Sequence, residues 1–197
     1  MKLLVDRLTE EASDETFAGD AAWRAAHLAV GDVAGAPEVA DLRVDLRARA
    51  LAADLLLEGR LGGLVGLTCS RCLARYRAPI REQFRLVLEP AGDRVPADPE
   101  GAEALASDGL ALGDELETGW FRGPEIRLDR FVAELVVLSL PVQPLCREEC
   151  RGICPHCGVD RNEQGCDCSE AQPRSPFSAL ESLRGSLARA DDEGENR

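Results

Sequence analysis

Six of the eight cysteines in the chain lie within residues 146–168, and the other two form a pair far upstream. A Cys-x-x-Cys pair lets one tight turn direct two sulfur atoms at one ion, and a second pair completes a tetrahedral four-thiolate zinc site. The spacing therefore predicts zinc as the cofactor and makes every cysteine a candidate ligand. The candidates are Cys69, Cys72, Cys146, Cys150, Cys154, Cys157, Cys166 and Cys168.

Two divisions of these ligands are open. Short separation favours one site built from residues 154, 157, 166 and 168, which leaves the upstream pair to join Cys146 and Cys150. The alternative joins the upstream pair to Cys154 and Cys157. Gly158 directly follows Cys157 and can adopt a φ above zero, which lets the chain turn back toward the sulfur atoms. Sulfur–sulfur distances distinguish the two divisions, because the sulfur ligands of one zinc lie within about 4 Å of one another.

Composition limits the classes of partner. The 197 residues are 45% hydrophobic, which suits one domain with a core, or such a domain with a small metal module. The net charge is −13, and an acidic surface repels phosphate, so the charge argues against broad nucleic-acid binding. A basic protein partner suits this charge better.

The chain lacks the patterns of membrane and secreted proteins. Residues 1–15 contain no apolar core of signal-peptide length, and no stretch approaches the roughly 20 apolar residues of a membrane helix. We therefore expect a cytoplasmic protein, whose thiols stay reduced and serve as metal ligands. In a secreted chain, the same cysteine spacing would instead indicate a disulfide framework.

The metal ligands are expected to lie on an antiparallel sheet. Residues 41–50 alternate strictly between apolar and charged side chains, which predicts a strand with one buried face. Its arginines, Arg43, Arg47 and Arg49, are interpreted as a solvated face, with contact to an acidic ligand as the alternative. Short apolar runs over residues 54–89 continue the sheet and place the upstream cysteine pair at a turn between two strands.

Helices complete an α+β fold. Apolar spacing predicts a helix over residues 14–28, and a second one over residues 129–140 that is capped by Asp129 and ended by Pro141. The second helix is apolar enough to pack across the sheet, which we expect to be open or curled toward a barrel.

Three regions follow from these patterns. Residues 1–145 are expected to form the α+β domain, with an acidic mobile loop over residues 90–125. Residues 146–170 form a segment like a zinc ribbon. Residues 171–197 are predicted to hold a short helix, with Phe177, Leu180 and Leu183 on one face, and a disordered tail.

Four segments together resemble the YceD family of large ribosomal RNA subunit accumulation proteins. They are Cys69-Ser-Arg-Cys-Leu73, residues 134–141 (ELVVLSLP), Cys150-Arg-Gly-Ile-Cys-Pro-His-Cys-Gly158 and residues 176–183 (PFSALESL). Their order and separation match the family from about residue 40 to residue 185. The resemblance implies a bacterial cytosolic protein needed for normal levels of large-subunit ribosomal RNA. It brings no catalytic residues with it.

The expected function is therefore that of a non-enzymatic ribosome-biogenesis factor with structural zinc. Its partner is expected to be a ribosomal protein or a large-subunit precursor, contacted through the acidic loop or the C-terminal helix face. An RNA-binding zinc ribbon is the first alternative, because Arg147, Arg151 and Arg161 surround the cysteines. A thiol redox enzyme or zinc hydrolase is the weaker one, since eight cysteines fill two closed sites and no acid–base group accompanies them.

Overall fold

The computed structural model describes residues 1–28, 38–113 and 117–168. The chain divides into two compact units, Met1–Gly152 and Ile153–Arg197, and the second is described as far as residue 168. The sequence placed this boundary after residue 145. The structure keeps residues 146–152 in the first unit, because Cys146 and Cys150 lie against a turn of its sheet.

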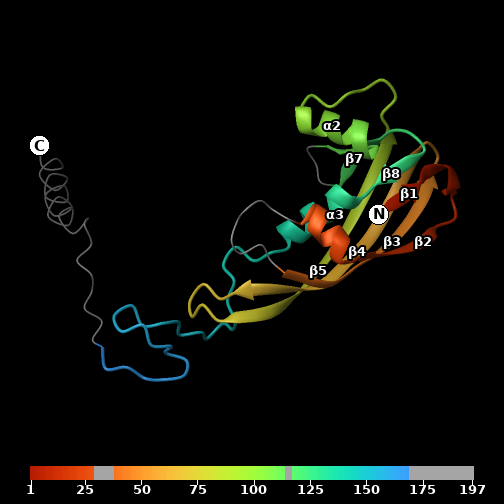
Figure 1. Cartoon of the computed structure of the whole chain (residues 1–197). Helices are drawn as coiled ribbons and strands as arrows, with labels where there is room; N and C mark the ends of the chain where they lie inside the picture. Colours follow the sequence, from red (N-terminus) through yellow and green to blue (C-terminus); the bar gives the residue numbers. More distant parts are fainter. Residues whose placement is uncertain (29–37, 114–116, 169–197) are drawn as a thin grey trace, which may run out of the picture. The chain divides into compact units, whose positions relative to one another are not determined.

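A twisted six-stranded sheet forms the first unit (Figure 1). Its strands pair antiparallel, except for one parallel pair between β5 and β7. In their order across the sheet they are β2 (Ser13–Gly19), β3 (Glu38–Leu51), β4 (Asp54–Thr68), β5 (Arg75–Pro90), β7 (Thr118–Phe121) and β6 (Leu110–Leu112). A separate ladder pairs β1 (Lys2–Leu4) with β8 (Glu125–Arg127), and the single-turn helix η1 (Val5–Arg7) follows β1.

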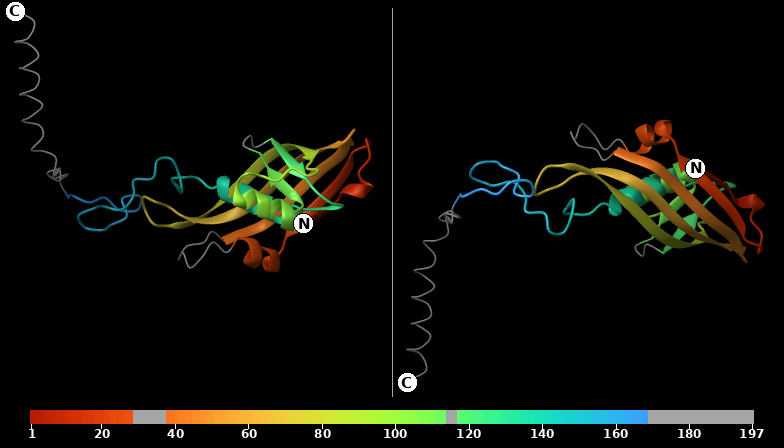
Figure 2. Two further views of the ribbon diagram at one scale, coloured as in Figure 1. Left: turned by 90° about the horizontal axis from the view of Figure 1, so that it is seen from above. Right: turned by 90° about the horizontal axis from the view of Figure 1, so that it is seen from below.

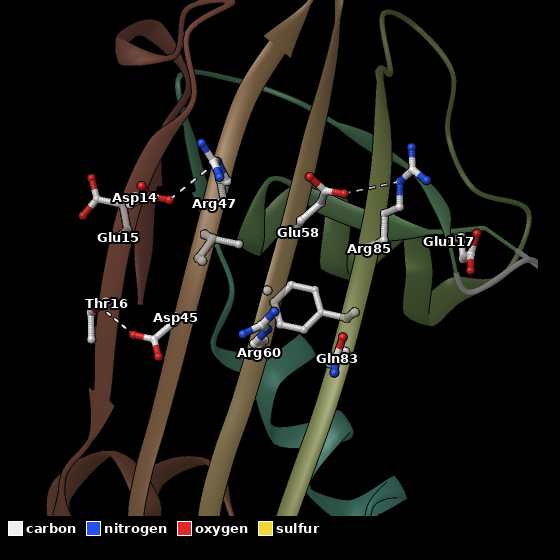
Figure 3. Close-up of a pocket in the computed structure, with 13 residues that line it drawn as sticks. Asp14, Glu15, Thr16, Asp45, Arg47, Glu58, Arg60, Gln83, Arg85 and Glu117 are labelled. Carbon is white, nitrogen blue, oxygen red and sulfur yellow. Dashed lines mark hydrogen bonds and ion pairs between the residues drawn. The ribbon is translucent and has the colours of Figure 1, made fainter.

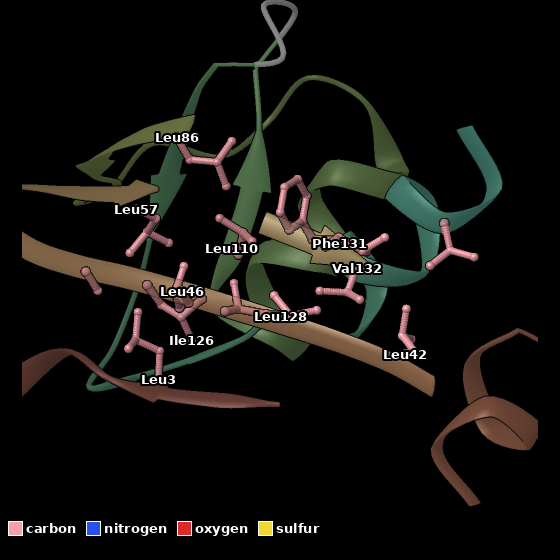
Figure 4. Close-up of a cluster of buried hydrophobic side chains, with 14 of the residues drawn as sticks. Leu3, Leu42, Leu46, Leu57, Leu86, Leu110, Ile126, Leu128, Phe131 and Val132 are labelled. Atoms are coloured by element: carbon pink, nitrogen blue, oxygen red, sulfur yellow. The ribbon is translucent and has the colours of Figure 1, made fainter. Parts of the chain in front are cut away.

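Three helices complete the first unit: α1 (Ala21–His27), α2 (Pro99–Asp108) and α3 (Asp129–Leu138). Helix α3 crosses one face of the sheet, as the view from above in Figure 2 shows. Its side chains Phe131, Val132 and Val136 are buried with the inward residues of β3, β4 and β5 (Figure 4). Phe84 of β5 meets Phe131 edge-on, with ring centroids 5.0 Å apart, which fixes the helix against the sheet.

The alternation over residues 41–50 is confirmed as part of β3, whose inward side chains are buried while its charged ones stay exposed. The α+β class is also confirmed. The sheet does not close into a barrel, because β2 and β6 end it and do not pair with each other among the described residues. The expected short strands over residues 54–89 are two long ones, β4 and β5.

The helix expected over residues 14–28 was wrong in its first half. Residues 13–19 form strand β2, which pairs with β3 from Ser13↔Ala48 to Gly19↔Leu42. Helix α1 begins only at Ala21, after Asp20 caps it by accepting a hydrogen bond from the backbone N–H of Trp23. Pairing with the neighbouring strand outweighs the local helical pattern here.

The acidic loop expected over residues 90–125 is largely regular structure. It contains α2, β6 and β7, and a small second core forms where Leu105 of α2 packs with Ala91, Ala111 and Trp120. The apolar residues in this segment are few, but they come from elements that meet in space. The acidic side chains of α2 therefore stand on an ordered helix.

Asp129 begins α3 but does not cap it. The N-cap residue is Leu128, and no side chain caps the helix. The Asp129 carboxylate is instead buried, and it accepts hydrogen bonds of 2.6 Å each from Trp23 Nε1 and from the amino group of Met1. It therefore ties α1 and the first strand to the start of α3.

None of the helices in the described part of the chain has the length and apolar character needed to cross a membrane. The predicted helix face of Phe177, Leu180 and Leu183, and the predicted tail, lie outside the described residues.

Candidate metal centres

The first cysteine cluster joins the tip of the β4–β5 hairpin to the segment that follows α3. The hairpin turn carries Cys69 and Cys72, and the later segment supplies Cys146 and Cys150. The sulfur atoms of Cys69 and Cys150 are 3.8 Å apart, and those of Cys72 and Cys146 are 3.7 Å apart. All four sulfur atoms lie within 4.8 Å of one another.

Backbone hydrogen bonds and one left-handed residue shape this turn. The N–H of Cys69 donates to the carbonyl of Ala74, and the N–H of Leu73 donates back to the carbonyl of Cys69, each at 2.9 Å. Leu73 adopts a φ of 61°, a left-handed conformation that costs energy in a non-glycine residue but lets the turn close. Both cysteines of the pair are thereby aimed to the same side.

Hydrogen bonds also connect the two chain segments around the cluster. The backbone N–H of Ser70 donates to the carbonyl of Pro144 at 2.8 Å. The guanidinium of Arg71 donates to the carbonyls of Cys150, at 2.9 Å, and Glu148, at 3.2 Å. Arg71 thereby fastens the segment after α3 to the hairpin.

The thiols of the first cluster differ in acidity. Hydrogen bonds from the backbone N–H groups of Cys146 and Cys72 lower the pKa of Cys69 to about 6. Burial and the neighbouring sulfur atoms raise the pKa of Cys146 to about 12. An ion with positive charge at the centre would favour the thiolate form of all four ligands.

The second cluster is local, because its four cysteines, 154, 157, 166 and 168, lie within one short segment of the second unit. Gly158 has a φ of 75° and donates its N–H to the carbonyl of Cys154 at 2.9 Å, as the turn predicted at this glycine requires. A single bridge between Ile153 and Asp160 is the only strand-type pairing in the described part of this unit. Cys154 is buried, and Cys157 is exposed.

The second cluster repeats the acidity pattern of the first. Hydrogen bonds from the backbone N–H groups of Cys157 and His156 lower the pKa of Cys154 to about 6. The Cys157 sulfur and burial raise the pKa of Cys168 to about 12. In both clusters, backbone hydrogen bonds therefore lower the pKa of the first cysteine of the Cys-x-x-Cys turn.

Both clusters fit a tetrahedrally coordinated ion. With metal–sulfur bonds of about 2.3 Å, a tetrahedron places its sulfur atoms about 3.8 Å apart. The first cluster shows separations of 3.7 and 3.8 Å, and the sulfur atoms of the second all lie within 4.8 Å of one another. A disulfide would require an S–S distance of about 2.05 Å, and none of the eight cysteines forms one. An all-sulfur donor set suits zinc or iron and does not suit magnesium or calcium.

The structure groups the sulfur atoms as the first of the two sequence-based divisions does, with residues 69, 72, 146 and 150 in one cluster and residues 154, 157, 166 and 168 in the other. His156 is not part of either group. The arginines of β5 were not singled out in the sequence. Arg75, Arg77, Arg81 and Arg85 occupy alternate positions of the strand, but Glu82 interrupts the strict alternation with apolar residues that identified β3.

Comparison with known proteins places the chain in a family. The family model described as large ribosomal RNA subunit accumulation protein YceD matches residues 57–184, which is more than half of the chain. The chain belongs to the YceD family. The matched region includes the β4–β5 hairpin, α3 and both cysteine clusters. No solved structure matches the chain.

Two curated relatives illustrate the range of this family. An uncharacterized protein of Mycobacterium tuberculosis (strain H37Rv) is 30% identical over 118 residues, covering 60% of this chain and 50% of the relative. The chloroplastic large ribosomal RNA subunit accumulation protein YCED homolog 1 of Arabidopsis thaliana is 23% identical over 172 residues, covering 78% of this chain and 51% of that protein. The chain thus spans about half the length of the curated relatives it matches.

Proposed function

We propose that this YceD-family chain is a cytoplasmic, non-enzymatic ribosome-biogenesis factor that supports the accumulation of large-subunit ribosomal RNA. The match of the family model over residues 57–184 supports this proposal, and the name of the Arabidopsis relative agrees with it. In this role the protein binds assembling particles and leaves the chemistry to other factors.

The two cysteine clusters hold structural zinc in this proposal. Zinc takes four thiolates in closed tetrahedral sites, whereas a catalytic zinc keeps one position open for water or substrate. Four sulfur atoms within 4.8 Å of one another leave no such position in either cluster. The ion would hold the hairpin tip to the segment after α3 in the first unit, and would organise the second unit.

A thiol redox enzyme is the weaker alternative. Redox Cys-x-x-Cys motifs sit at a helix N-terminus, where the helix dipole stabilises the thiolate. Here Cys69 and Cys72 lie between two strands, and Cys154 and Cys157 lie in an irregular segment.

The direct partner in this proposal is a basic ribosomal protein. Each four-thiolate zinc site adds a net charge of about −2, so zinc makes a chain of charge −13 more acidic still. Such a field steers basic partners toward the protein. Asp93 and two exposed glutamates of α2, Glu100 and Glu103, form a candidate contact surface that the packing of Leu105 holds in place.

Affinity capture tests this function. The tagged, zinc-loaded chain is expected to recover large-subunit ribosomal proteins and precursor RNA from cells, and to cosediment with large-subunit precursors. The triple variant Asp93→Asn/Glu100→Gln/Glu103→Gln is expected to recover less of the basic protein partner with unchanged zinc content.

A variant with the same change in charge, Glu10→Gln/Glu11→Gln/Glu15→Gln, serves as the control and is expected to behave as the wild type. Recovery of no ribosomal component, or of small-subunit components alone, contradicts the proposed function. Equal recovery by the two triple variants contradicts the assigned protein-contact surface.

A further inference from the structure

The outward face of β4 and β5 carries a strip of arginines that the functions above do not use. We propose that this strip, defined as Arg60, Arg75, Arg77 and Arg81, binds the phosphate backbone of RNA. This adds a partner to the proposed function and rests on it only for the choice of RNA as the polyanion.

Strand register places these arginines on one face. Leu61, Val65 and Ile80 are buried in the core, so the alternate positions of β4 and β5 point to the opposite side of the sheet. All four strip arginines are exposed. On β5 the outward positions from residue 75 to residue 85 are arginine, arginine, proline, arginine, glutamine and arginine, with no carboxylate among them.

The strip arginines form no ion pair with the described part of the protein. None of the four has a carboxylate within 4.0 Å among the residues that the structure describes. The neighbouring arginines of the same face behave differently: Arg43 pairs with Asp45 at 2.9 Å, and Arg85 faces Glu58 at 3.9 Å. A charge left without a protein partner at the surface is available to an external anion.

Small side chains leave the surface of β4 open beside the strip. The outward positions of β4 after Arg60 are Gly62, Leu64 and Gly66, and a Cβ added to Gly62 would meet no atom within 4 Å. Gly62 lies directly between Arg43 of β3 and Arg81 of β5 in the register of the sheet. A strand of nucleic acid can therefore approach the backbone of β4 while the strip arginines of β5 reach its phosphates.

A pocket of about 720 Å³ continues this face toward β2 and β3. In Figure 3 its charged side chains, including Arg47, Arg60 and Arg85, project from neighbouring strands on the side of the sheet away from α3. Here arginines alternate with carboxylates, and Arg60 of the strip stands directly opposite Asp45 in the register of the sheet. The strongest attraction for phosphate therefore lies along β5, whose outward positions from residue 75 to residue 85 carry no carboxylate.

The acidic remainder of the chain does not cancel this attraction. At physiological ionic strength, charges separated by more than about 8 Å are largely screened, so a bound phosphate responds mainly to the nearest arginines. Successive outward residues of a strand are about 6.6 Å apart, which is of the order of the spacing between phosphates along one nucleic-acid strand. Arginine also matches phosphate with two parallel hydrogen bonds.

Phosphate suits this face better than an acidic protein does. Stable protein interfaces centre on buried aromatic or large apolar anchors, and the outward positions of β4 and β5 over residues 60–85 contain no aromatic residue. The absence of stacking aromatics at these positions also predicts little preference for base sequence, because backbone contacts carry no sequence information.

Fluorescence anisotropy with a labelled uridine 20-mer tests the strip on the zinc-loaded full chain. Four phosphate contacts predict a slope of about −3 for log K against log[KCl]. The variant Arg77→Gln/Arg81→Gln is expected to reduce the slope to about −1.5 and to weaken binding at least tenfold in about 0.1 M KCl. The control variant Arg7→Gln/Arg127→Gln removes the same charge away from the strip and is expected to keep the wild-type slope.

The inference is overturned if the wild type fails to bind the RNA in low salt, or if the two double variants lose equal affinity. Tighter binding of poly-glutamate than of RNA, with the same dependence on Arg77 and Arg81, would assign the strip to an acidic protein. Capture of large-subunit precursors is measured in a separate experiment. If capture occurs without RNA binding by the strip, only this inference fails; if the strip binds RNA but no precursor is captured, only the proposed function fails.

Discussion

The two cysteine clusters contain the same ligands but stand in different surroundings. The first is built from segments more than 70 residues apart, and hydrogen bonds from Ser70 and Arg71 connect these segments beside the sulfur atoms. The second is drawn from one short segment of a unit whose described part contains a single isolated bridge and no helix.

This difference indicates two uses of one ligand set. The first ion would fasten elements that a hydrophobic core also holds together, since Leu57, Leu86 and Val132 are completely buried there. The second ion would supply most of the free energy that orders its unit, as it does in small zinc domains. The predictions below test this contrast, beginning with the largest expected effect.

Removal of zinc should abolish the structure of residues 153–168 and leave the sheet folded. Structural zinc contributes on the order of 10 kcal/mol to such segments, far more than one bridge and a few turns can replace. Hydrogen exchange after chelation is expected to show loss of protection at Cys154 and Gly158, with protection retained in β3, β4 and β5. Uniform loss across both units, or retained protection at Gly158, contradicts the contrast.

Substitution of one ligand in each cluster should show that the stability of the first unit depends on the first ion and not on the second. Cys69→Ser removes the first ion and is expected to destabilise the first unit by about 4 kcal/mol, because it loosens the hairpin tip and leaves a buried polar group. Cys157→Ser removes the second ion and should change the unfolding of the first unit by less than about 0.5 kcal/mol. Denaturant unfolding of both variants, with the intrinsic fluorescence of Trp23 and Trp120 as the signal, makes the comparison.

Asp129 tests whether the first unit has stabilising contacts independent of metal. Burial alone would raise the pKa of Asp129, but hydrogen bonds from the Met1 amino group and Trp23 outweigh it, and the pKa is lowered. Its contribution is therefore present above the unfolded pKa of about 3.9 and is lost as pH falls through the lower folded value. Asp129→Asn is expected to cost about 2 kcal/mol at neutral pH, and less in acid.

The measurement for Asp129→Asn is the difference in unfolding free energy from the wild type between pH 7 and pH 3, with zinc content recorded in parallel. The zinc content at pH 7 should not change, because the carboxylate contacts neither cluster. A cost that grows as the pH falls would refute the assigned contacts.

The number of protons released when zinc binds should differ least between the two clusters. The pKa values of Cys72 and Cys166 are raised, and those of Cys146 and Cys168 are about 12, so at least two thiols per cluster are protonated at pH 7 without metal. Zinc binding must displace these protons, and affinity should rise with pH at both clusters. Calorimetry in buffers of different ionisation enthalpy, applied to Cys72→Ser and Cys157→Ser, counts the protons for each intact site.

Local patterns in the sequence predicted the features that are local in the structure. Strict alternation located β3, and the interval from Cys157 to Cys166 indicated one compact cluster. The turn at Gly158 followed from the need for a positive φ. Each of these depends on residues close in the chain, where spacing alone fixes the geometry.

The failures involve partners distant in sequence. Asp129 looks like a helix cap, yet its partners are Trp23 and the amino group of Met1, which no local pattern reveals. Residues 13–19 become a strand because β3 lies beside them. The acidic segment is ordered because Leu105 meets Trp120 and two alanines from other elements. Tertiary contacts decide all three.

Native mass spectrometry of the reduced chain tests the central claim, that each cluster holds its own ion, most directly. The account predicts two zinc ions in the wild type, one in Cys72→Ser, one in Cys157→Ser and none in the double variant Cys72→Ser/Cys157→Ser. If residues 69, 72, 154 and 157 shared one ion, the double variant would keep one zinc. That result, or a wild type with fewer than two zinc ions, would contradict the account.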